Sequence, residues 1–184
     1  QREIGTDVTD IQSAVHSALR GDLDVIVVGE LHDIETMKAA LTLAETGHLV
    51  FGTLHTGIAL STVDRYVDAF PAEQQPQICT QLAASLQAII SQQLIRKVNG
   101  GRIAAIEILT ATPAVRSLIR EGKTHQLANT IENVGDSGMT SMDRVLADLV
   151  NQGFISRSDA LEHAIDQESI HRLTYGAVFR PPWI

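Results

Sequence analysis

The sequence has one cysteine, no long apolar run and few basic residues, and each shortage excludes a class of protein. Cys79 alone allows no disulfide within the chain, which favours an intracellular protein, and its helical surroundings favour a small core residue over a reactive thiol. No apolar segment approaches the ~18 residues of a membrane span, and no signal peptide opens the chain. The 14 Lys and Arg residues against 22 Asp and Glu residues give a net charge of −8, which argues against a nucleic-acid-binding surface.

The rest of the composition is that of a soluble globular protein, with 44% hydrophobic and 20% charged residues. A chain of 184 residues forms one ordinary domain or part of a larger one. It starts at Gln1 rather than at methionine, so we expect a fragment or a cleaved product.

The clearest pattern lies in residues 24–56. Val25 to Val28 form a continuous β-branched run, typical of a parallel strand covered on both faces. Asp33 is placed to cap a helix whose apolar residues recur three and four apart, and Gly47 is placed to end it. A second strand then leads to His55. The order strand, helix, strand predicts a βαβ unit with parallel strands.

Helical and strand patterns continue on both sides of this unit. Helices are predicted at about 9–20, 57–70, 76–94, 124–134, 141–151 and 157–167, with one more from Pro113. Strands 94–98 and 102–109 are predicted to form a β-hairpin around a glycine turn. Thr112, Thr140 and Ser156 are expected to cap their helices. We place a boundary near Thr110, which gives a sheet domain at 1–110, a helical domain at 111–173 and an irregular tail at 174–184.

Polar side chains follow the two predicted parallel strands. Glu30 comes directly after the first strand, at the carboxyl end, where open α/β sheets build their sites; the alternative is an acid on a solvent-facing turn. His48 and His55 lie seven residues apart and cannot share one face of a strand, so we expect different roles for them, unless both are structural. His55 falls beside Glu30. The histidines and the cysteine lack the spacing of zinc ligands, so no metal site is expected within the chain itself.

Two strings identify a family. DVIVVGE at 24–30 and AETGHLVFGTLHT at 44–56 resemble the Walker B and histidine boxes of the secretion-type ATPases, and within them the PilT family of pilus retraction motors. Further similarity covers SLQAIISQQLIRKVNGGR at 85–102 and TPAVRSLIREGK at 112–123. The resemblance implies an α/β fold: part of a RecA-like P-loop NTPase core, with parallel strands plus a β-hairpin, followed by a small all-helical part.

The same resemblance implies ATP and Mg²⁺ as cofactors of the intact protein. Glu30 would orient the attacking water or hold the metal, and His55 would sense the terminal phosphate. Arg20 would act across a subunit boundary, as trans-acting arginines do in hexameric ATPases. The remaining residues that we expect at the nucleotide are Gly29, Thr53, His48 and Arg2.

Two positions depart from the family. His16 stands where the helix before the Walker B strand usually carries an arginine, and His32 stands for the arginine of the GE-x-RD pattern. An imidazole is shorter than a guanidinium and mostly neutral at pH 7, so it does not replace a bidentate fork. These departures favour an alternative, a catalytically weak paralogue that acts as a coupling or regulatory subunit of an active motor.

No phosphate-binding loop is present. Gly122-Lys123-Thr124 resembles the end of G-x-x-x-x-G-K-[ST], but Ser117 occupies the place of the first glycine. We expect the true loop upstream of Gln1, and therefore an isolated chain that is inactive and binds ATP weakly, with one apolar flank of its sheet uncovered. The segment 112–123 instead matches the retraction-motor motif, in which Arg116 and Arg120 would form a presentation surface or a plain solvated face.

The function that the resemblance implies is part of a hexameric, ATP-hydrolysing motor that retracts type IV pili and powers twitching motility. It would be cytoplasmic and peripheral at the inner membrane, with a membrane platform protein and a paralogous motor ATPase as partners, and no nucleic acid. A secretion or pilus-extension ATPase is a further alternative. The absence of a Cys-x-x-Cys zinc insert and the motif at 112–123 disfavour it.

Overall fold

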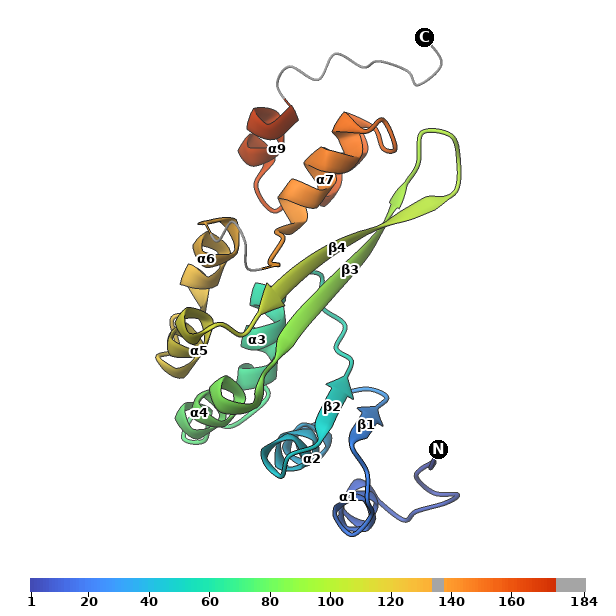
Figure 1. The fold of residues 1–184 in the computed structure, drawn as a ribbon, viewed down its shortest axis with the longest axis vertical. Coiled ribbons are helices and arrows are strands. Elements are labelled where there is room, and N and C mark those ends of the chain that lie inside the picture. The colour runs from blue at the N-terminus through green and yellow to red at the C-terminus, as the bar shows by residue number, and fades with distance from the viewer. Residues whose placement is uncertain (134–137, 175–184) are drawn as a thin grey trace. The chain divides into compact units, whose positions relative to one another are not determined.

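The computed structural model describes residues 1–133 and 138–174, which contacts divide into two units (Figure 1). The first unit comprises Gln1–His55, Thr62–Gln87 and Ala111–Thr124. The second comprises Thr56–Ser61, Ala88–Thr110 and the described residues from His125 onward. The domain boundary near Thr110 stays a prediction.

A βαβ element begins the first unit after helix α1 (Ile11–Leu19). Strand β1 (Val25–Val28), helix α2 (Ile34–Glu45) and strand β2 (Leu49–Gly52) follow in the predicted order. The two strands pair in parallel, with Val25 opposite Leu49 and Val28 opposite Gly52. The parallel βαβ prediction is therefore confirmed.

The helices of the first unit start at residues whose side chains satisfy free backbone N–H groups. Asp10 accepts from Ser13 N at 2.7 Å at the start of α1, and Asp33 accepts from Thr36 N at 2.8 Å at the start of α2. Thr112 caps α5 (Pro113–Arg120), which has proline at its first position. The two other helices of this unit are α3 (Ala59–Asp68), whose first turn belongs to the second unit, and α4 (Gln75–Ser85).

A buried hydrogen bond links α2 to α3 in the first unit. The hydroxyl of Tyr66 donates to the carbonyl oxygen of Met37 at 2.8 Å, and burial raises the pKa of Tyr66. Val63, Phe70 and Ile78 are buried in the same unit. Val63 lies on α3 and Ile78 on α4, at two of the apolar positions from which these helices were predicted.

An antiparallel hairpin of two nine-residue strands organises the second unit. Strands β3 (Ala88–Arg96) and β4 (Arg102–Thr110) pair from Ala88 opposite Thr110 to Arg96 opposite Arg102. Gly100 and Gly101 have φ values of 85° and 74°, which the turn between the strands requires and which only glycine adopts readily. The helical elements that follow are η1 (Thr124–Gln126), α6 (Leu127–Asn133), α7 (Met142–Asn151), α8 (Arg157–His163) and α9 (Gln167–Thr174).

One face of the hairpin forms the core of this unit. Ile95 and Ala105 point inward and are fully buried against α7 residues Met142 and Leu146, and Ile170 of α9 joins the same cluster. Alternate residues of each strand face this core, as the period of two in a strand requires. The predicted hairpin is confirmed, although its first strand begins six residues earlier than expected, at Ala88.

The helix predicted over 76–94 is wrong in its second half. Helix α4 ends at Ser85, and residues from Ala88 onward form β3. Leu82, Leu86 and Ile90 fit a four-residue rhythm, but residues 88–96 alternate between exposed and buried. The cross-strand pairing with β4 is what decides between the two patterns, and it is not visible in the local sequence.

Three other boundaries differ from the predictions. Ser141, not Thr140, is the N-cap residue of α7, and its side chain makes no capping bond. The helix predicted over 157–167 ends at His163, because Asp143 accepts from the backbone N–H groups of Ile165 and Asp166 at 2.8 and 2.9 Å and holds the chain in a turn. The helix predicted over 124–134 starts as a 3₁₀ turn.

The irregular tail predicted at 174–184 lies outside the described residues except for Thr174, which ends α9. Among the described residues, no helix has the length and apolar character needed to span a membrane.

Candidate functional site

The carboxyl ends of β1 and β2 are tied together beyond the last paired residues. The backbone N–H of Leu31 donates to the carbonyl oxygen of Thr53 at 2.9 Å, and the Thr53 hydroxyl donates to the carbonyl oxygen of Gly29. These two bonds extend the parallel ladder past Val28 and Gly52. They hold the backbone on both sides of Glu30, at the carboxyl end of the strand, where the sequence predicts the site.

Glu30 and His55 lie side by side at this edge. Nε2 of His55 is 3.2 Å from Oε1 of Glu30, within ion-pair distance if the imidazole is protonated. The Glu30 side chain is 50% exposed and that of His55 is 79% exposed, so both can reach a ligand from solvent. The prediction that they emerge together from neighbouring parallel strands is confirmed.

Gly52 makes room for the chain that carries Glu30. A Cβ at residue 52 would lie 2.6 Å from Cδ1 and 2.9 Å from Cγ of Leu31, and Leu31 is buried. The glycine is needed because Leu31 packs directly over the end of β2. Leu31 directly follows Glu30, so its burial anchors the chain beside that carboxylate.

His32 is engaged locally, beside the start of α2. Its Nε2 lies 3.0 Å from Oδ2 of Asp33, the N-cap of α2. The backbone hydrogen bond from Thr36 is the main cause that lowers the pKa of Asp33, with the His32 charge adding to it. Asp33 therefore stays ionised, which suits a helix N-terminus.

The other predicted site residues lie apart from this pair. His48 sits at the amino end of β2, with Nδ1 3.1 Å from both the Leu43 carbonyl oxygen and the Thr46 hydroxyl, at the end of α2. Arg2 and Arg20 are exposed. In the part of the chain that the structure describes, no hydrogen bond or ion pair joins His48, Arg2 or Arg20 to Glu30 or His55.

Arg20 nevertheless shares a surface hollow with His16. The hollow has a volume of about 390 Å³ and is lined by one face of α1, at Ser13, His16, Ser17 and Arg20. These residues recur three and four apart, so they project from α1 in one direction. His16, which stands where the family usually carries an arginine, thus lies on the same face of α1 as Arg20.

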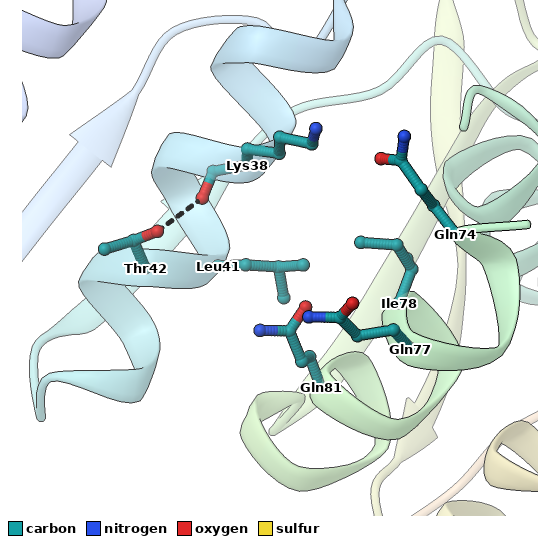
Figure 2. A pocket seen from close by; sticks show the side chains of 7 residues that line it. All are labelled: Lys38, Leu41, Thr42, Gln74, Gln77, Ile78 and Gln81. Carbon is teal, nitrogen blue, oxygen red and sulfur yellow. Dashed lines mark hydrogen bonds between the residues drawn. The ribbon is translucent and has the colours of Figure 1, made fainter. Parts of the chain in front are cut away.

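A second pocket of about 260 Å³ lies between α2 and α4 (Figure 2). Figure 2 shows Lys38 reaching from α2 toward the side chains of α4, with Leu41 and Ile78 between the two helices. Nζ of Lys38 is 5.9 Å from the ring centroid of Phe70, a cation–π contact. The lining residues are Lys38, Leu41, Thr42, Gln74, Gln77, Ile78 and Gln81, and none of them is a predicted site residue.

One face of the β1–β2 pair is exposed and apolar. Val25 and Val27 are 52% and 72% exposed, and their partners Leu49 and Phe51 are 45% and 53% exposed. Parallel strands are normally covered on both faces. This face carries the apolar exposure that the sequence predicts for the sheet.

Glu30 has the chemistry to hold Mg²⁺, one of the groups that the resemblance implies. Mg²⁺ is usually held by one or two carboxylates together with water and substrate phosphates, and Glu30 offers such a carboxylate. Within residues 1–133 and 138–174, no three His, Cys, Asp or Glu side chains gather closely enough to hold a metal by themselves. For ATP the fit is partial, because the sequence contains no G-x-x-x-x-G-K-[ST] cradle for the phosphates.

One buried carboxylate, that of Glu107, was missed from the sequence. Glu107 on β4 accepts from Ala59 N at 2.5 Å and from Met142 N at 3.1 Å, which are the first residues of α3 and α7. Burial raises the pKa of Glu107, and the nearby Asp143 charge adds to this. The signal was available, because Glu107 falls on the inward-facing positions of β4 between Ala105 and Leu109.

Arg116 has a structural role rather than an outward one. Its Nη1 donates to the carbonyl oxygens of Ala83 and Ala84 at 2.6 and 2.8 Å, at the end of α4. A guanidinium at a helix C-terminus satisfies free carbonyl groups and complements the helix dipole. Of the two arginines predicted as a presentation surface, Arg120 is the exposed one.

Comparisons with known proteins place this geometry in context. Residues 5–162 match the family model of type II/IV secretion system proteins. The chain is 52% identical over 164 residues to the "Type IV pilus retractation ATPase PilT" of Pseudomonas aeruginosa, covering 89% of this chain and 48% of that protein. It is 50% identical over 171 residues to a twitching motility protein of Neisseria gonorrhoeae, covering 92% of this chain and 46% of that protein.

The fold agrees with the sequence matches. A crystal structure of the pilus retraction motor PilT with bound ADP superimposes with a TM-score of 0.84 and 46% identity, covering 94% of this chain and 48% of that chain. The α/β fold class with parallel strands, a hairpin and following helices is confirmed. The chain spans about half the length of the relatives that it matches.

Proposed function

The chain belongs to the family of type II/IV secretion system proteins, and on that premise we propose that it forms part of an ATP-hydrolysing motor for type IV pilus retraction. Two relatives at 50% identity or more are named for pilus retraction and twitching motility. Within this chain, the observation that supports the proposal most is the contact of 3.2 Å between Glu30 and His55 at the carboxyl ends of two parallel strands.

Glu30 is the residue that acts on the attacking water. ATP with Mg²⁺ supplies the phosphoryl group and the positive charge that the reaction needs. The Glu30 carboxylate, half exposed, orients the water and accepts its proton. His55 Nε2 steadies this carboxylate when it donates toward Oε1, and the exposed imidazole is free to turn to a phosphate oxygen instead.

The remaining predicted residues act around this pair. Gly29 and Thr53 hold the backbone beside Glu30 through the bond between the Thr53 hydroxyl and the Gly29 carbonyl oxygen. Arg20 and Arg2 are exposed, as arginines that reach a neighbouring subunit must be. His48, at the far end of β2, holds the end of α2 rather than the nucleotide.

The motor that we propose is a homo-oligomeric ring of six subunits. It works in the cytoplasm at the inner membrane, against a platform protein of the pilus machinery, and alone or together with a paralogous motor ATPase. The chain by itself is proposed to be inactive, because it has no phosphate cradle.

A second candidate is a catalytically weak paralogue that couples or regulates an active motor. The observation that favours it is the engagement of His32 with Asp33 at 3.0 Å. An imidazole in this contact cannot give the forked, permanently charged donor that an arginine supplies. His16, which lies on the same face of α1 as Arg20, also favours this second candidate.

A chimaera separates the two candidates. Residues 1–173 would replace the matching half of Pseudomonas aeruginosa PilT, so that the phosphate cradle comes from the relative. An active motor predicts ATP hydrolysis that falls ~100-fold or more in the Glu30→Gln variant, as expected for the loss of a general base. Hydrolysis no faster than that of Glu30→Gln, in a chimaera that still binds nucleotide and assembles, supports the paralogue.

A further inference from the structure

The two faces of the β3–β4 hairpin differ in what covers them. The inward face is packed, with Ile95, Ala105 and Leu109 fully buried. The outward face is open: Ile90 is 67% exposed and Leu94 is 54% exposed. Ile106, which lies across the pair between these two, is 37% exposed. Gln92 lies between Ile90 and Leu94 on the same face and opposite Ile106, so the face is an exposed apolar patch with one polar residue within it. An exposed apolar patch on a sheet marks a contact surface.

Two arginines lie directly opposite each other on the same face, next to the turn of the hairpin. Arg96 and Arg102 are a cross-strand pair, both are exposed, and alternation places them on the side of Leu94. Like charges directly opposite each other destabilise a hairpin. Among the described residues neither side chain has a hydrogen bond or an ion pair, although the whole chain carries a net charge of −8.

We propose that this outer hairpin face, defined by Ile90, Leu94, Ile106, Arg96 and Arg102, docks an amphipathic α-helix of a partner polypeptide. The apolar stripe of the helix lies on the isoleucines and the leucine. Carboxylates at one end of the helix neutralise the two arginines. This occupant accounts for both observations. Covering the apolar side chains removes them from water, and carboxylates offset the repulsion between the two opposed arginines.

The dimensions suit a short helix. The seven residues from Ile90 to Arg96 span ~20 Å at the rise of a strand. An α-helix covers that distance with ~13 residues, which place an apolar side chain over the sheet every three or four positions. The charged end then lies about one helical turn beyond the last apolar contact.

A helix fits this surface better than an added strand. The backbone of Ile108 already exchanges hydrogen bonds with Thr140 at 2.9 and 3.0 Å on the free side of β4. The open apolar surface described above is a face of side chains, and helices are the elements that cover such faces in α/β proteins.

A designed peptide tests the docking surface directly. The probe is a fluorescent helical peptide of about 15 residues, with leucines along one face and two glutamates in its last turn. We expect saturable binding to the 184-residue chain by fluorescence anisotropy. We also expect a loss of binding in Leu94→Asp and a ~10-fold or greater loss in Arg96→Glu with Arg102→Glu.

The first control makes the same change of charge at two arginines outside the proposed docking face. Arg65→Glu with Arg144→Glu reverses two exposed charges elsewhere and is expected to bind as the wild type does. A peptide with lysines in place of the glutamates should bind the Arg96→Glu, Arg102→Glu variant more tightly than the wild type, which a misfolded variant cannot do.

Three results would overturn the proposal. One is the absence of saturable binding, and another is equal binding of a peptide with the same residues in scrambled order. The third is sedimentation showing a dimer of the chain that Leu94→Asp dissociates, because the occupant would then be a second copy.

Discussion

Glu107 accepts a hydrogen bond from the backbone N–H of Met142 at 3.1 Å, and so caps α7 from a strand 35 residues away in sequence. The N-cap residue Ser141 makes no side-chain bond of its own. The second oxygen of Glu107 accepts from Ala59 at 2.5 Å. One buried carboxylate thus serves the first turns of two helices, where the helix dipoles favour negative charge.

Glu107→Gln is expected to destabilise the protein. The amide keeps one acceptor oxygen and turns an NH₂ group toward a backbone N–H, which leaves a buried donor unsatisfied at a cost of about 1–3 kcal/mol. Urea unfolding measures the loss, and Glu162→Gln, at an exposed position, is the matched control. Equal unfolding free energies for the two variants would refute the capping role.

The same carboxyl predicts a pH dependence of stability. Burial raises the pKa of Glu107 above its ordinary value of 4.5, so the folded state binds a proton more tightly than the unfolded state does. Its contribution to stability is therefore fully present below the unfolded pKa and declines as pH rises through the folded pKa. We expect the wild type to lose stability relative to Glu107→Gln as pH rises from 4.5. Urea titrations of both proteins across this range check the prediction, and parallel curves would contradict it.

Gly52→Ala is expected to disturb the backbone beside Glu30. The added methyl group would meet Cδ1 of Leu31 at 2.6 Å, and overpacking of this kind costs about 1–3 kcal/mol. Gly29→Ala is the control, since a Cβ there meets nothing within 4 Å and should change stability by less than about 0.5 kcal/mol. Thermal unfolding of both variants tests the difference, and a neutral Gly52→Ala would remove the role assigned to this glycine.

Arg116→Ala is expected to loosen the end of α4. The guanidinium donates to two carbonyl oxygens, at 2.6 and 2.8 Å, and hydrogen bonds to charged groups contribute about 1.5–3 kcal/mol each when buried, less here because Arg116 is half exposed. Arg120→Ala, on the same helix and exposed, should stay near the wild type. Hydrogen exchange at the last turn of α4 locates the effect, and faster exchange in both variants alike would argue against this contact.

The sequence predicts the local features of this fold well. The β-branched run at Val25 to Val28, the capping residue Asp33 and the glycine turn at Gly100 and Gly101 each act through their neighbours in sequence. The Glu30–His55 contact was also predictable, because strand ends in a parallel βαβ unit meet at one edge.

The features that the sequence did not reveal depend on distant partners. Strand β3 reads as the end of a helix until Ile90 is seen opposite Ile108. The turn at Ile165 depends on Asp143, and the end of α4 depends on Arg116. None of these pairings leaves a local signature. The first joins the backbones of two strands, and the other two join a side chain to backbone groups more than 20 residues away.

A double-mutant cycle of ATP hydrolysis on Glu30 and His55 tests the central claim most directly. In the chimaera with the phosphate cradle of the relative, Glu30→Gln, His55→Ala and the double variant are compared with the parent at saturating ATP. Because the two side chains lie 3.2 Å apart and act on one phosphoryl group, we predict that each single change lowers kcat ~100-fold and that the double variant is little worse than either. A His55→Ala rate equal to that of the parent, or losses that simply multiply, would contradict a joint action of these residues.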